Sequence, residues 1–457
     1  MSTAGEKPNI ILINCDDLGY GDLGCYGSEI NSTPALDRMA EGGVRFTDFY
    51  MASPICSPSR GAMMTGCYPR RIGFDDFEGE GVLFPGQPVG MSDREVTVAG
   101  LLKGRGYATK IIGKWHCGDQ PEFLPTRHGF DSYYGLPYSN DMGRQARMRR
   151  DHPPLPLLRD EEVIEEQPDQ ASLTSRYTEE AVRFLRENRD GPFFLYFAHM
   201  HVHLPHYVPQ SFLRKSLNGV YGGAVANIDW STSVLLDELE QLGIDGKTLV
   251  VFTSDNGSNG RFGGSNKPLR GRKGTTWEGG QRVACIARWA GTIPEGRTCS
   301  EVVTSMDFLP TFANLAGAKV PDDRIIDGQD VRALLLGEEG AGSPRECFFY
   351  YLRGRLEAVR CGKWKLHCAK GDREICELYD LQEDVHESIN LAERHPEVVA
   401  ELGEKLDACR RDIGDRRTGE EGENCRPIGR VPEGRPLTAY DPDHPYLVAE
   451  YDLPHFG

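Results

Sequence analysis

Four short apolar runs, separated by segments with helical periodicity, constrain the fold of this 457-residue chain most strongly. The apolar runs span residues 9–14, 108–112, 192–198 and 248–254. Runs of this length, rich in Ile, Val and Phe, are typical of strands buried in a mainly parallel sheet. The helical patterns span residues 34–42, 96–104, 178–187 and 228–242. The alternation predicts an α/β fold, a large doubly wound and mainly parallel sheet sandwiched by helices.

Each apolar run is followed by a polar or charged cluster. The clusters contain Asp16 and Asp17 after the first run, Lys114 and His116 after the second, histidines within 199–206 after the third, and Asp255 and Asn256 after the fourth. In doubly wound sheets, ligands bind beyond the carboxyl ends of the strands. The coincidence predicts an active site at this edge of the sheet.

The pattern changes after about residue 343. Short strand-like runs lead to a charged helical segment near 396–411, which predicts a small antiparallel sheet with one packed helix. We therefore expect a catalytic unit at 1–343 and a C-terminal α+β unit at 344–457. Residues 144–170 are rich in Pro and charge without periodicity, which predicts an irregular surface excursion, structural or flanking the substrate.

Composition restricts the partners of the protein. The net charge of −17 argues against nucleic acid and anionic membranes, because the long-range field repels both. No apolar stretch approaches the roughly 20 residues that span a bilayer. The thirteen cysteines lack C-x-x-C clusters and predict mostly reduced core thiols. The polar N-terminal segment has no signal-peptide core, which predicts a cytoplasmic protein as the sequence stands, or an exported or periplasmic one if a leader was removed.

Cys56 begins the run CSPSRGAMMTG. Pro58 suits the first turn of a helix, so Cys56 or Ser57 is expected at a helix N-terminus, where unpaired N–H groups and partial positive charge collect. Such a site lowers the pKa of a thiol or holds an anion, and Arg60, a candidate catalytic residue, adds a planar cation suited to an oxyanion one turn later. The alternative is a helix end with a buried structural Cys.

Two of the polar clusters suggest a metal site. Taken separately, Asp16 and Asp17 are also typical of a capping pair, and Asp255, Asn256 and Gly257 of a tight turn. Taken together, three carboxylates and an amide at neighbouring strand ends repel one another unless a cation is present. Hard oxygen ligands favour Ca²⁺ or Mg²⁺.

The sequence Cys-x-Pro-Ser-Arg at 56–60, followed by Thr65 and Gly66, resembles the signature of the type I sulfatases, the formylglycine-dependent, arylsulfatase A-like family of the alkaline phosphatase superfamily. The resemblance implies that a maturation enzyme oxidises Cys56 to formylglycine. One hydroxyl of the hydrated aldehyde then attacks sulfur and displaces the alcohol, and deprotonation of the other expels sulfate from the covalent ester and regenerates the aldehyde.

The same resemblance implies roles for other residues. It assigns Asp16, Asp17, Asp255 and Asn256, with residue 56, to a divalent metal site that usually holds calcium. The element GKWHCG is similar to the family's Gly-Lys-Trp-His, so that Lys114 would contact formylglycine and sulfate and His116 would act as a base in sulfate release. Without the resemblance, these two residues are equally typical of an exposed Lys beside a core His.

The run HMHVHLPH at 199–206 contains four histidines that compete for one role. His203, in His-Leu-Pro, best matches the family's sulfate-binding histidine, a proton donor to the leaving group. His201 is the second choice, as a substrate-binding residue, and His206 is the third. Alternating histidines also suggest a zinc site, although no Cys or carboxylate completes one locally.

Two further elements carry the resemblance. Lys273, in LRGRKGTTWEGG, resembles the family's second catalytic lysine, although Arg272 replaces the usual Gly and a basic surface loop is the alternative. Several cations can offset the charge that builds on the transferred group. Ser139, in GLPYSNDMG, resembles a polar substrate contact. The C-terminal stretch ELYDLQEDVHESINLA is similar to the family's closing hairpin.

These elements predict a sulfatase acting on aryl or carbohydrate sulfates, with a sulfated small molecule or glycan as substrate and a formylglycine-generating enzyme as partner. One alternative is a phosphonate or phosphate ester hydrolase on the same scaffold. The other is a non-catalytic binder of sulfated ligands, if Cys56 is never oxidised.

Overall fold

The computed structural model describes residues 7–144 and 152–446. Its centre is a large sheet with eleven strands in this part of the chain, in the order β11-β2-β10-β9-β1-β8-β4-β5-β6-β7, with β12 beside β2. The strands are β1 (Asn9–Cys15), β2 (Val44–Tyr50), β4 (Ala108–Gly113), β5 (Ser132–Gly135), β6 (Pro156–Arg159), β7 (Glu162–Glu166), β8 (Phe193–Ala198), β9 (Thr248–Ser254), β10 (Arg282–Arg288), β11 (Arg297–Cys299) and β12 (Val303–Thr304). Strands β9, β1, β8, β4 and β5 pair in parallel. The predicted mainly parallel α/β sheet is confirmed.

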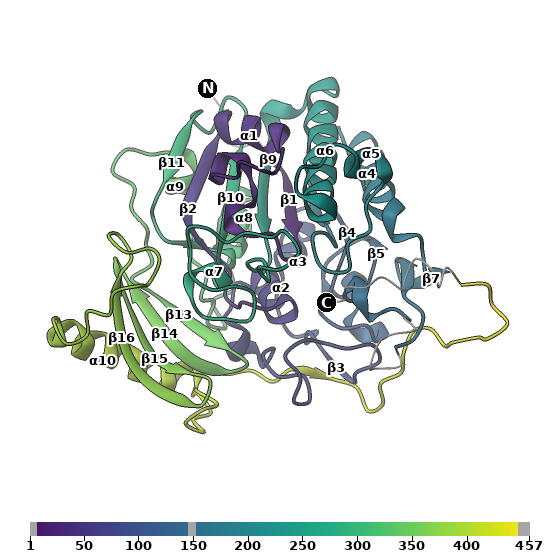
Figure 1. Cartoon of the computed structure of the whole chain (residues 1–457). Coiled ribbons are helices and arrows are strands. Elements are labelled where there is room, and N and C mark those ends of the chain that lie inside the picture. Colours follow the sequence, from purple (N-terminus) through teal and green to yellow (C-terminus); the bar gives the residue numbers. More distant parts are fainter. Residues whose placement is uncertain (1–6, 145–151, 447–457) are drawn as a thin grey trace.

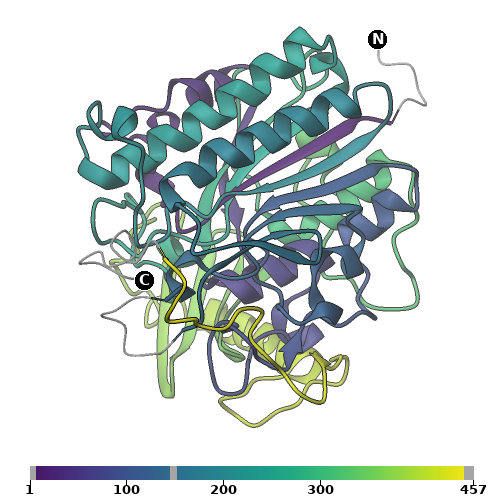
Figure 2. The same cartoon turned by 90° about the vertical axis from the view of Figure 1, so that its right-hand side faces the viewer.

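Helices cover both faces of this sheet (Figure 2). One layer contains α1 (Pro34–Glu41), α4 (Gln170–Glu187) and α6 (Gly219–Gln241), and the other contains α2 (Cys56–Thr65), α3 (Val98–Lys103) and α8 (Phe308–Leu315). Short helices are α5 (Gln210–Leu213), α7 (Glu278–Gln281) and α9 (Arg332–Leu336). Side chains alternate along β1, so that Ile11 and Ile13 face the core under the first layer, while Ile10 and Leu12 face the core under the second. Burial on both faces explains why β1 is a continuous apolar run.

Two expected helices extend further toward the N-terminus than their patterns indicated. Helix α4 begins at Gln170, with Asp169 accepting a hydrogen bond from the Ala171 N–H, and α6 begins at Gly219. The first turns of α6 contain Gly222, where a Cβ atom would lie 2.5 Å from Ser216 Oγ. A side chain at position 222 would clash there, so the close approach of the preceding turn requires glycine in spite of its low helix propensity.

The expected irregular excursion at 144–170 is wrong over 156–166, where β6 and β7 form an antiparallel hairpin that extends the large sheet. Strand β6 pairs with β5 from another part of the chain, and this pairing has no periodic signal within the segment itself. Residues 145–151 lie outside the described residues.

A second, four-stranded antiparallel sheet packs beside the first (Figure 1). Its strands are β13 (Cys347–Leu352), β14 (Arg355–Cys361), β15 (Trp364–Lys370) and β16 (Arg373–Asp380), and α10 (Pro396–Ile413) covers it. The predicted small sheet with one packed helix is confirmed. The chain then returns toward the large sheet, where β17 (Gly429–Arg430) pairs with β3 (Val89–Gly90). The division into units at 343 and 344 stays a prediction.

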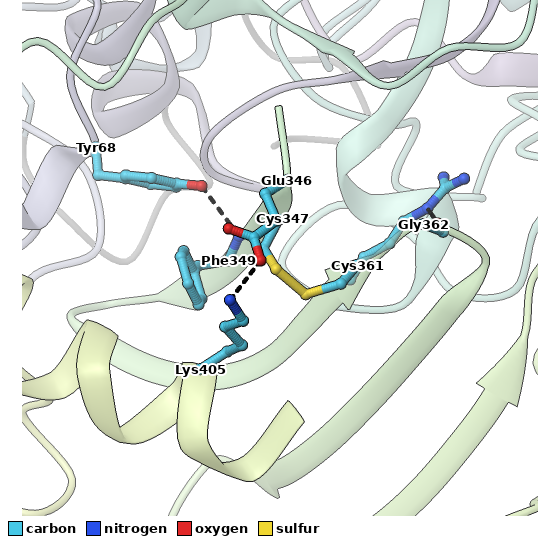
Figure 3. The surroundings of a disulfide bond; sticks show 8 residues. Tyr68, Glu346, Cys347, Phe349, Cys361, Gly362 and Lys405 are labelled. Carbon is cyan, nitrogen blue, oxygen red and sulfur yellow. Dashed lines mark hydrogen bonds and ion pairs between the residues drawn. A yellow bond between two sulfur atoms is a disulfide. The ribbon is translucent and has the colours of Figure 1, made fainter. Parts of the chain in front are cut away.

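One disulfide lies in the small sheet, where Cys347 of β13 and Cys361 of β14 are register partners (Figure 3). The other eleven cysteines are free thiols, in agreement with the expectation of mostly reduced cysteines. Tyr68, shortly after α2, accepts a hydrogen bond from the Phe349 N–H beside the disulfide. Across residues 7–144 and 152–446, no helix has the length and apolar character needed to cross a bilayer.

Candidate active site

Four adjacent strands of the large sheet deliver the predicted polar clusters to one edge. In the order β9-β1-β8-β4, each strand is followed directly by its cluster. Main-chain hydrogen bonds continue past the strand ends: the Asp255 N–H donates to Cys15 O at 2.9 Å, the Asp16 N–H to His201 O at 2.9 Å, and the Lys114 N–H to Ala198 O at 2.8 Å. The clusters are therefore fixed relative to one another before any side-chain contact is made.

Cys56 is the first residue of α2, and Pro58 lies in its first turn, as predicted. The fully buried Sγ atom of Cys56 lies 3.4 Å from Asp16 Oδ1 and 4.0 Å from Asp17 Oδ1. Burial, followed by the Asp16 carboxylate, raises the pKa of the thiol well above its usual range. The expectation of a lowered thiol pKa at this helix end is therefore wrong, because burial and carboxylates outweigh the helix end; the anion site stays a prediction.

The predicted oxygen ligands surround residue 56. Asn256 donates through Nδ2 to Asp17 Oδ1 at 2.7 Å, and Asp255 Oδ1 accepts from the Asp17 N–H at 3.2 Å. Among the described residues, the buried Asn256 Oδ1 has no hydrogen-bond partner. Buried carboxylates beside a free amide oxygen form a hard donor set that fits Ca²⁺ or Mg²⁺.

The grouping of possible ligand atoms differs slightly from the prediction. One ligand atom each from Asp16, Asp17, Cys56 and His203 lies within 4.8 Å of the others. Asp255 faces the cation Arg60 instead, with Oδ2 at 2.9 Å from Arg60 Nε and 2.8 Å from Arg60 Nη2. Burial and the Asp16 charge raise the pKa of Asp255 to about 6.

Each acidic side chain of the cluster faces a cation from a different element. Lys114 Nζ lies 2.5 Å from Asp16 Oδ2, and Lys273 Nζ lies 2.8 Å from Asp17 Oδ1. Arg60 also donates through Nη1 to the Lys114 carbonyl at 2.8 Å, which ties α2 to the end of β4. Lys273 is the most accessible of these cations, with a side chain that is 20% exposed. The structure thus gathers two ammonium groups and one guanidinium around residue 56.

Ser139 connects two of the predicted residues. Its Oγ accepts from Lys114 Nζ at 3.2 Å and lies 3.4 Å from His203 Nδ1. His203 Nε2 lies 3.9 Å from Asp17 Oδ2, so this imidazole faces the carboxylates. The side chains of Ser139 and His203 therefore converge on the same buried group.

The remaining predicted histidines lie differently. His201 contributes its carbonyl to Asp16, and burial lowers the pKa of its imidazole to about 4. His206 Nε2 lies 3.0 Å from Val202 O, and its ring faces Tyr221 edge-on. Of the four histidines, only His203 belongs to the group of possible metal ligands in the described structure, so the histidines do not converge as a zinc site would require.

His116 is held by a residue that sequence reasoning missed. Its Nε2 lies 3.0 Å from the Leu83 carbonyl, while its buried Nδ1 has no hydrogen-bond partner in the described part of the chain. Burial, followed by the Lys114 charge, lowers the pKa of His116 well below its usual range. The Leu83 N–H in turn donates to Ser57 Oγ at 3.1 Å, a contact across 26 residues that no local signal could have indicated.

Comparisons with known proteins agree with this geometry. The sulfatase family model matches residues 8–318, and a model described as N-sulphoglucosamine sulphohydrolase, C-terminal, matches residues 272–412. The chain is 40% identical to arylsulfatase A of Homo sapiens over 447 residues, covering 87% of this chain and 86% of that protein. It is 42% identical to N-acetylgalactosamine-6-sulfatase of Canis lupus familiaris over 382 residues, covering 80% of this chain and 72% of that protein.

A solved structure shows the same architecture. The crystal structure of Ps i-CgsB in complex with k-i-k-neocarrahexaose matches with a TM-score of 0.79 and 30% identity, covering 88% of this chain and 92% of that one. The family model spans most of the chain and includes every element of the site, from the strand-end carboxylates to the Lys273 loop. The chain therefore belongs to the type I sulfatase family of sulfuric ester hydrolases.

Proposed function

We propose that this sulfatase acts through formylglycine formed from Cys56 and through a divalent cation, calcium or magnesium. The observation that carries the proposal is the position of the Cys56 Sγ, 3.4 Å from Asp16 at the start of a helix, inside a ring of carboxylates and cations. A hydrated aldehyde at this position supplies a hydroxyl nucleophile, and its maturation requires a formylglycine-generating enzyme as a partner.

Asp16, Asp17, Asp255 and Asn256 would hold the cation. The unpartnered Asn256 Oδ1 and the crowding of the carboxylates fit a hard cation at this place. When bound, the ion supplies positive charge that holds and polarises the sulfate group.

Lys114 and Lys273 are the two cations proposed to bind the sulfate group. Both ammonium groups end flexible side chains beside residue 56, so they can pair with sulfate oxygens as negative charge builds on them. Arg60 is different, because its hydrogen bonds to Asp255 and to the Lys114 carbonyl hold it in one place. We propose that it acts from this fixed place as the catalytic planar cation expected beside residue 56, and that it also holds Asp255 and the end of β4 in register.

The two histidines would move protons. Because a carbonyl only accepts, the contact with Leu83 O places the His116 proton on Nε2 and leaves Nδ1 as a base. Such a base can take the proton whose loss releases sulfate. His203 donates through Nδ1 to Leu204 O at 2.6 Å, so its Nε2 would carry a proton only in the doubly protonated imidazolium form. We propose that this form, which faces the Asp17 carboxylate, hands the Nε2 proton to the departing alcohol and is left as the neutral imidazole.

We propose an aryl or carbohydrate sulfate as the substrate. The matched relatives include an arylsulfatase and an N-acetylgalactosamine-6-sulfatase, and the matched crystal structure holds a neocarrahexaose. Ser139 and His201, at the same sheet edge, are the proposed substrate-binding residues.

The test is to co-express the chain with a formylglycine-generating enzyme and to analyse the tryptic peptide that contains residue 56 by mass spectrometry. We expect an aldehyde, turnover of an aryl sulfate, and no turnover by a Cys56→Ala variant that keeps the same circular dichroism spectrum. Turnover of an aryl phosphonate monoester and of a phosphate diester, measured side by side with the aryl sulfate, is expected to be slower than turnover of the sulfate. Sulfatase activity in Cys56→Ala, or faster turnover of the phosphonate, would contradict the proposal.

A further inference from the structure

The loop at 267–281, which carries Lys273, rests on side chains that come from the small sheet and the segment after it. The Thr276 carbonyl accepts from Lys365 Nζ at 2.9 Å. The Glu278 N–H donates to Glu387 Oε2 at 2.8 Å. Because these contacts engage the main chain of the loop, they determine its position whatever its side chains do.

Lys365, on β15, uses its full bonding capacity at this place. A lysine ammonium has three donors. Its Nζ lies 2.9 Å from Thr276 O, 2.8 Å from Glu278 Oε1 and 2.8 Å from Glu387 Oε1. The side chains of Lys365, Glu278 and Glu387 are completely buried. An ammonium bonded in three directions inside the protein has one position, so it defines the position of the loop.

A second anchor holds the same stretch of the loop. Thr276 Oγ1 donates to Glu357 Oε2 at 2.6 Å and accepts from Lys370 Nζ at 2.6 Å. Glu357 Oε1 accepts from the Gly371 N–H at 2.7 Å, so the carboxylate is itself fixed between β14 and the turn after β15. The loop is therefore held through both the main chain and the side chain of Thr276.

Glu278 extends the support to the large sheet. Its Oε2 accepts from Tyr50 Oη at 2.5 Å, and its Oε1 accepts from Tyr350 Oη at 2.7 Å. Burial alone would raise the pKa of Glu278, but Lys365, Arg282 and nearby cations outweigh it and hold the pKa well below the usual range. The hydrogen bonds that hold the loop thus form a continuous network from Lys365 on β15, through Glu278, to Tyr50 on β2.

At its other end, the loop contacts the catalytic segments. The Lys273 N–H donates to Ser258 O at 3.0 Å, and the Gly274 N–H donates to Pro54 O at 2.9 Å. Pro54 lies two residues before Cys56, and Gly274 has a φ of 75°, a conformation that glycine adopts without strain. Only two residues separate Lys273 from Thr276, so movement at the anchor is passed to the ammonium that faces Asp17.

We propose that Lys365, held by Glu387 and Glu278 and acting beside the separate Glu357 anchor of Thr276, is a positioning residue for the catalytic lysine Lys273. The inference rests on the proposed function, because it assumes that Lys273 acts in the transition state. On this proposal, the small sheet and its following segment form part of the catalytic apparatus without touching the substrate.

The test is a double-mutant cycle on kcat with Lys273→Met and Lys365→Met. Lys365→Met is expected to lower kcat at least tenfold with KM changed far less, because displacement of a catalytic group by about 1 Å can cost on the order of 100-fold. In the Lys273→Met background, the same substitution is expected to change kcat less than threefold, since there is no ammonium left to misplace. An equal loss of kcat in both backgrounds would show a merely structural role and overturn the proposal.

Two further variants keep the test decisive. If Lys365→Met does not fold, Thr276→Val removes the second anchor with little change in volume and is expected to show the same non-additivity at smaller amplitude. Arg71→Met is the matched control. Arg71 is also a buried cation with two carboxylate partners, but these partners, Asp327 and Asp412, do not belong to the loop at 267–281. The Arg71→Met variant is expected to lower stability without coupling to Lys273.

The outcomes also separate the two proposals. A wild-type protein with formylglycine but no sulfate turnover would overturn the proposed function itself. If wild type is active and Lys273→Met has unchanged kcat, Lys273 has no catalytic role and the positioning proposal fails, while formylglycine chemistry stands.

Discussion

At the scale of single residues, the site is defined by buried opposite charges. Asp16 faces Lys114, Asp17 faces Lys273, and Asp255 faces Arg60. A buried ion pair contributes little net stability, because desolvation of both charges offsets their attraction. A gain in stability therefore does not explain why three such pairs lie at one sheet edge. The proposed role in binding a cation and a sulfate group explains them better.

Asp17→Asn is expected to weaken Ca²⁺ binding at least tenfold, because it replaces an anionic ligand by a neutral amide of the same size. Isothermal titration calorimetry on the metal-depleted protein measures this directly, without reliance on turnover. Asp22→Asn is the matched control: Asp22 is also buried, but it accepts from Gly19 N–H, Ser265 N–H and Tyr221 Oη, and it lies outside the ligand group. Equal affinities of Asp17→Asn and wild type would remove Asp17 from the metal site.

At the scale of elements, the strands of the small sheet carry the frame that supports the Lys273 loop. Glu357 lies on β14 and Lys365 on β15, and the disulfide between Cys347 and Cys361 ties β13 to β14 at the end of the pair (Figure 3). Helix α10 packs its buried Leu402 on the same sheet. The disulfide thus restrains the sheet on which the loop rests.

Replacing both Cys347 and Cys361 by Ser is expected to lower the free energy of unfolding by about 3 kcal/mol, the loss of loop-closure constraint for a short loop, here with a sequence separation of 14. Urea denaturation followed by tryptophan fluorescence measures the change. A Cys376→Ser and Cys425→Ser double variant, at two exposed free thiols, is the control and is expected to match wild type. Identical unfolding of wild type with and without reductant would show that the bond does not stabilise the protein.

At the scale of the whole molecule, the layered core buries neutral histidines. His128 stacks on Trp115 with ring centroids 5.8 Å apart, and its Nε2 has no hydrogen-bond partner in the described chain. Burial lowers its pKa from 6.5 to about 4. Between these values the unfolded chain binds a proton that the folded protein does not, so stability is lost as the pH falls from about 6.5 toward 4.

His128→Phe is expected to remove this contribution. In wild type, a single histidine of this kind lowers the free energy of unfolding by at most about 1.4 kcal/mol for each pH unit by which the pH falls within this window. Denaturation curves at pH 7, 6, 5 and 4 should therefore show a shallower pH dependence in His128→Phe than in wild type. Replacement of the exposed His386 by Gln is the control, and an unchanged slope in His128→Phe would contradict the assignment.

Part of this architecture could be predicted from the sequence because its signals are local. The apolar runs that became β1, β4, β8 and β9, and the four strands of the small sheet, are each recognisable from the residue types within a few consecutive positions. Cys56 at the start of α2 followed from Pro58 in the first turn. Because parallel strands share one carboxyl edge, the gathering of the polar clusters also followed from order along the chain.

What the sequence by itself determined is therefore the sheet, the edge and the residue types of the site. Only the tertiary structure decided that His203, already first choice by resemblance, faces Asp17, and that Leu83 holds His116. It also decided that residues 156–166 extend the sheet and that Lys365 holds the Lys273 loop. The physical reason is that these features depend on contacts between segments far apart in the chain, whose partners leave no periodic mark in either segment. A local pattern can specify a strand, but the direction of a side chain at its end depends on what packs against it.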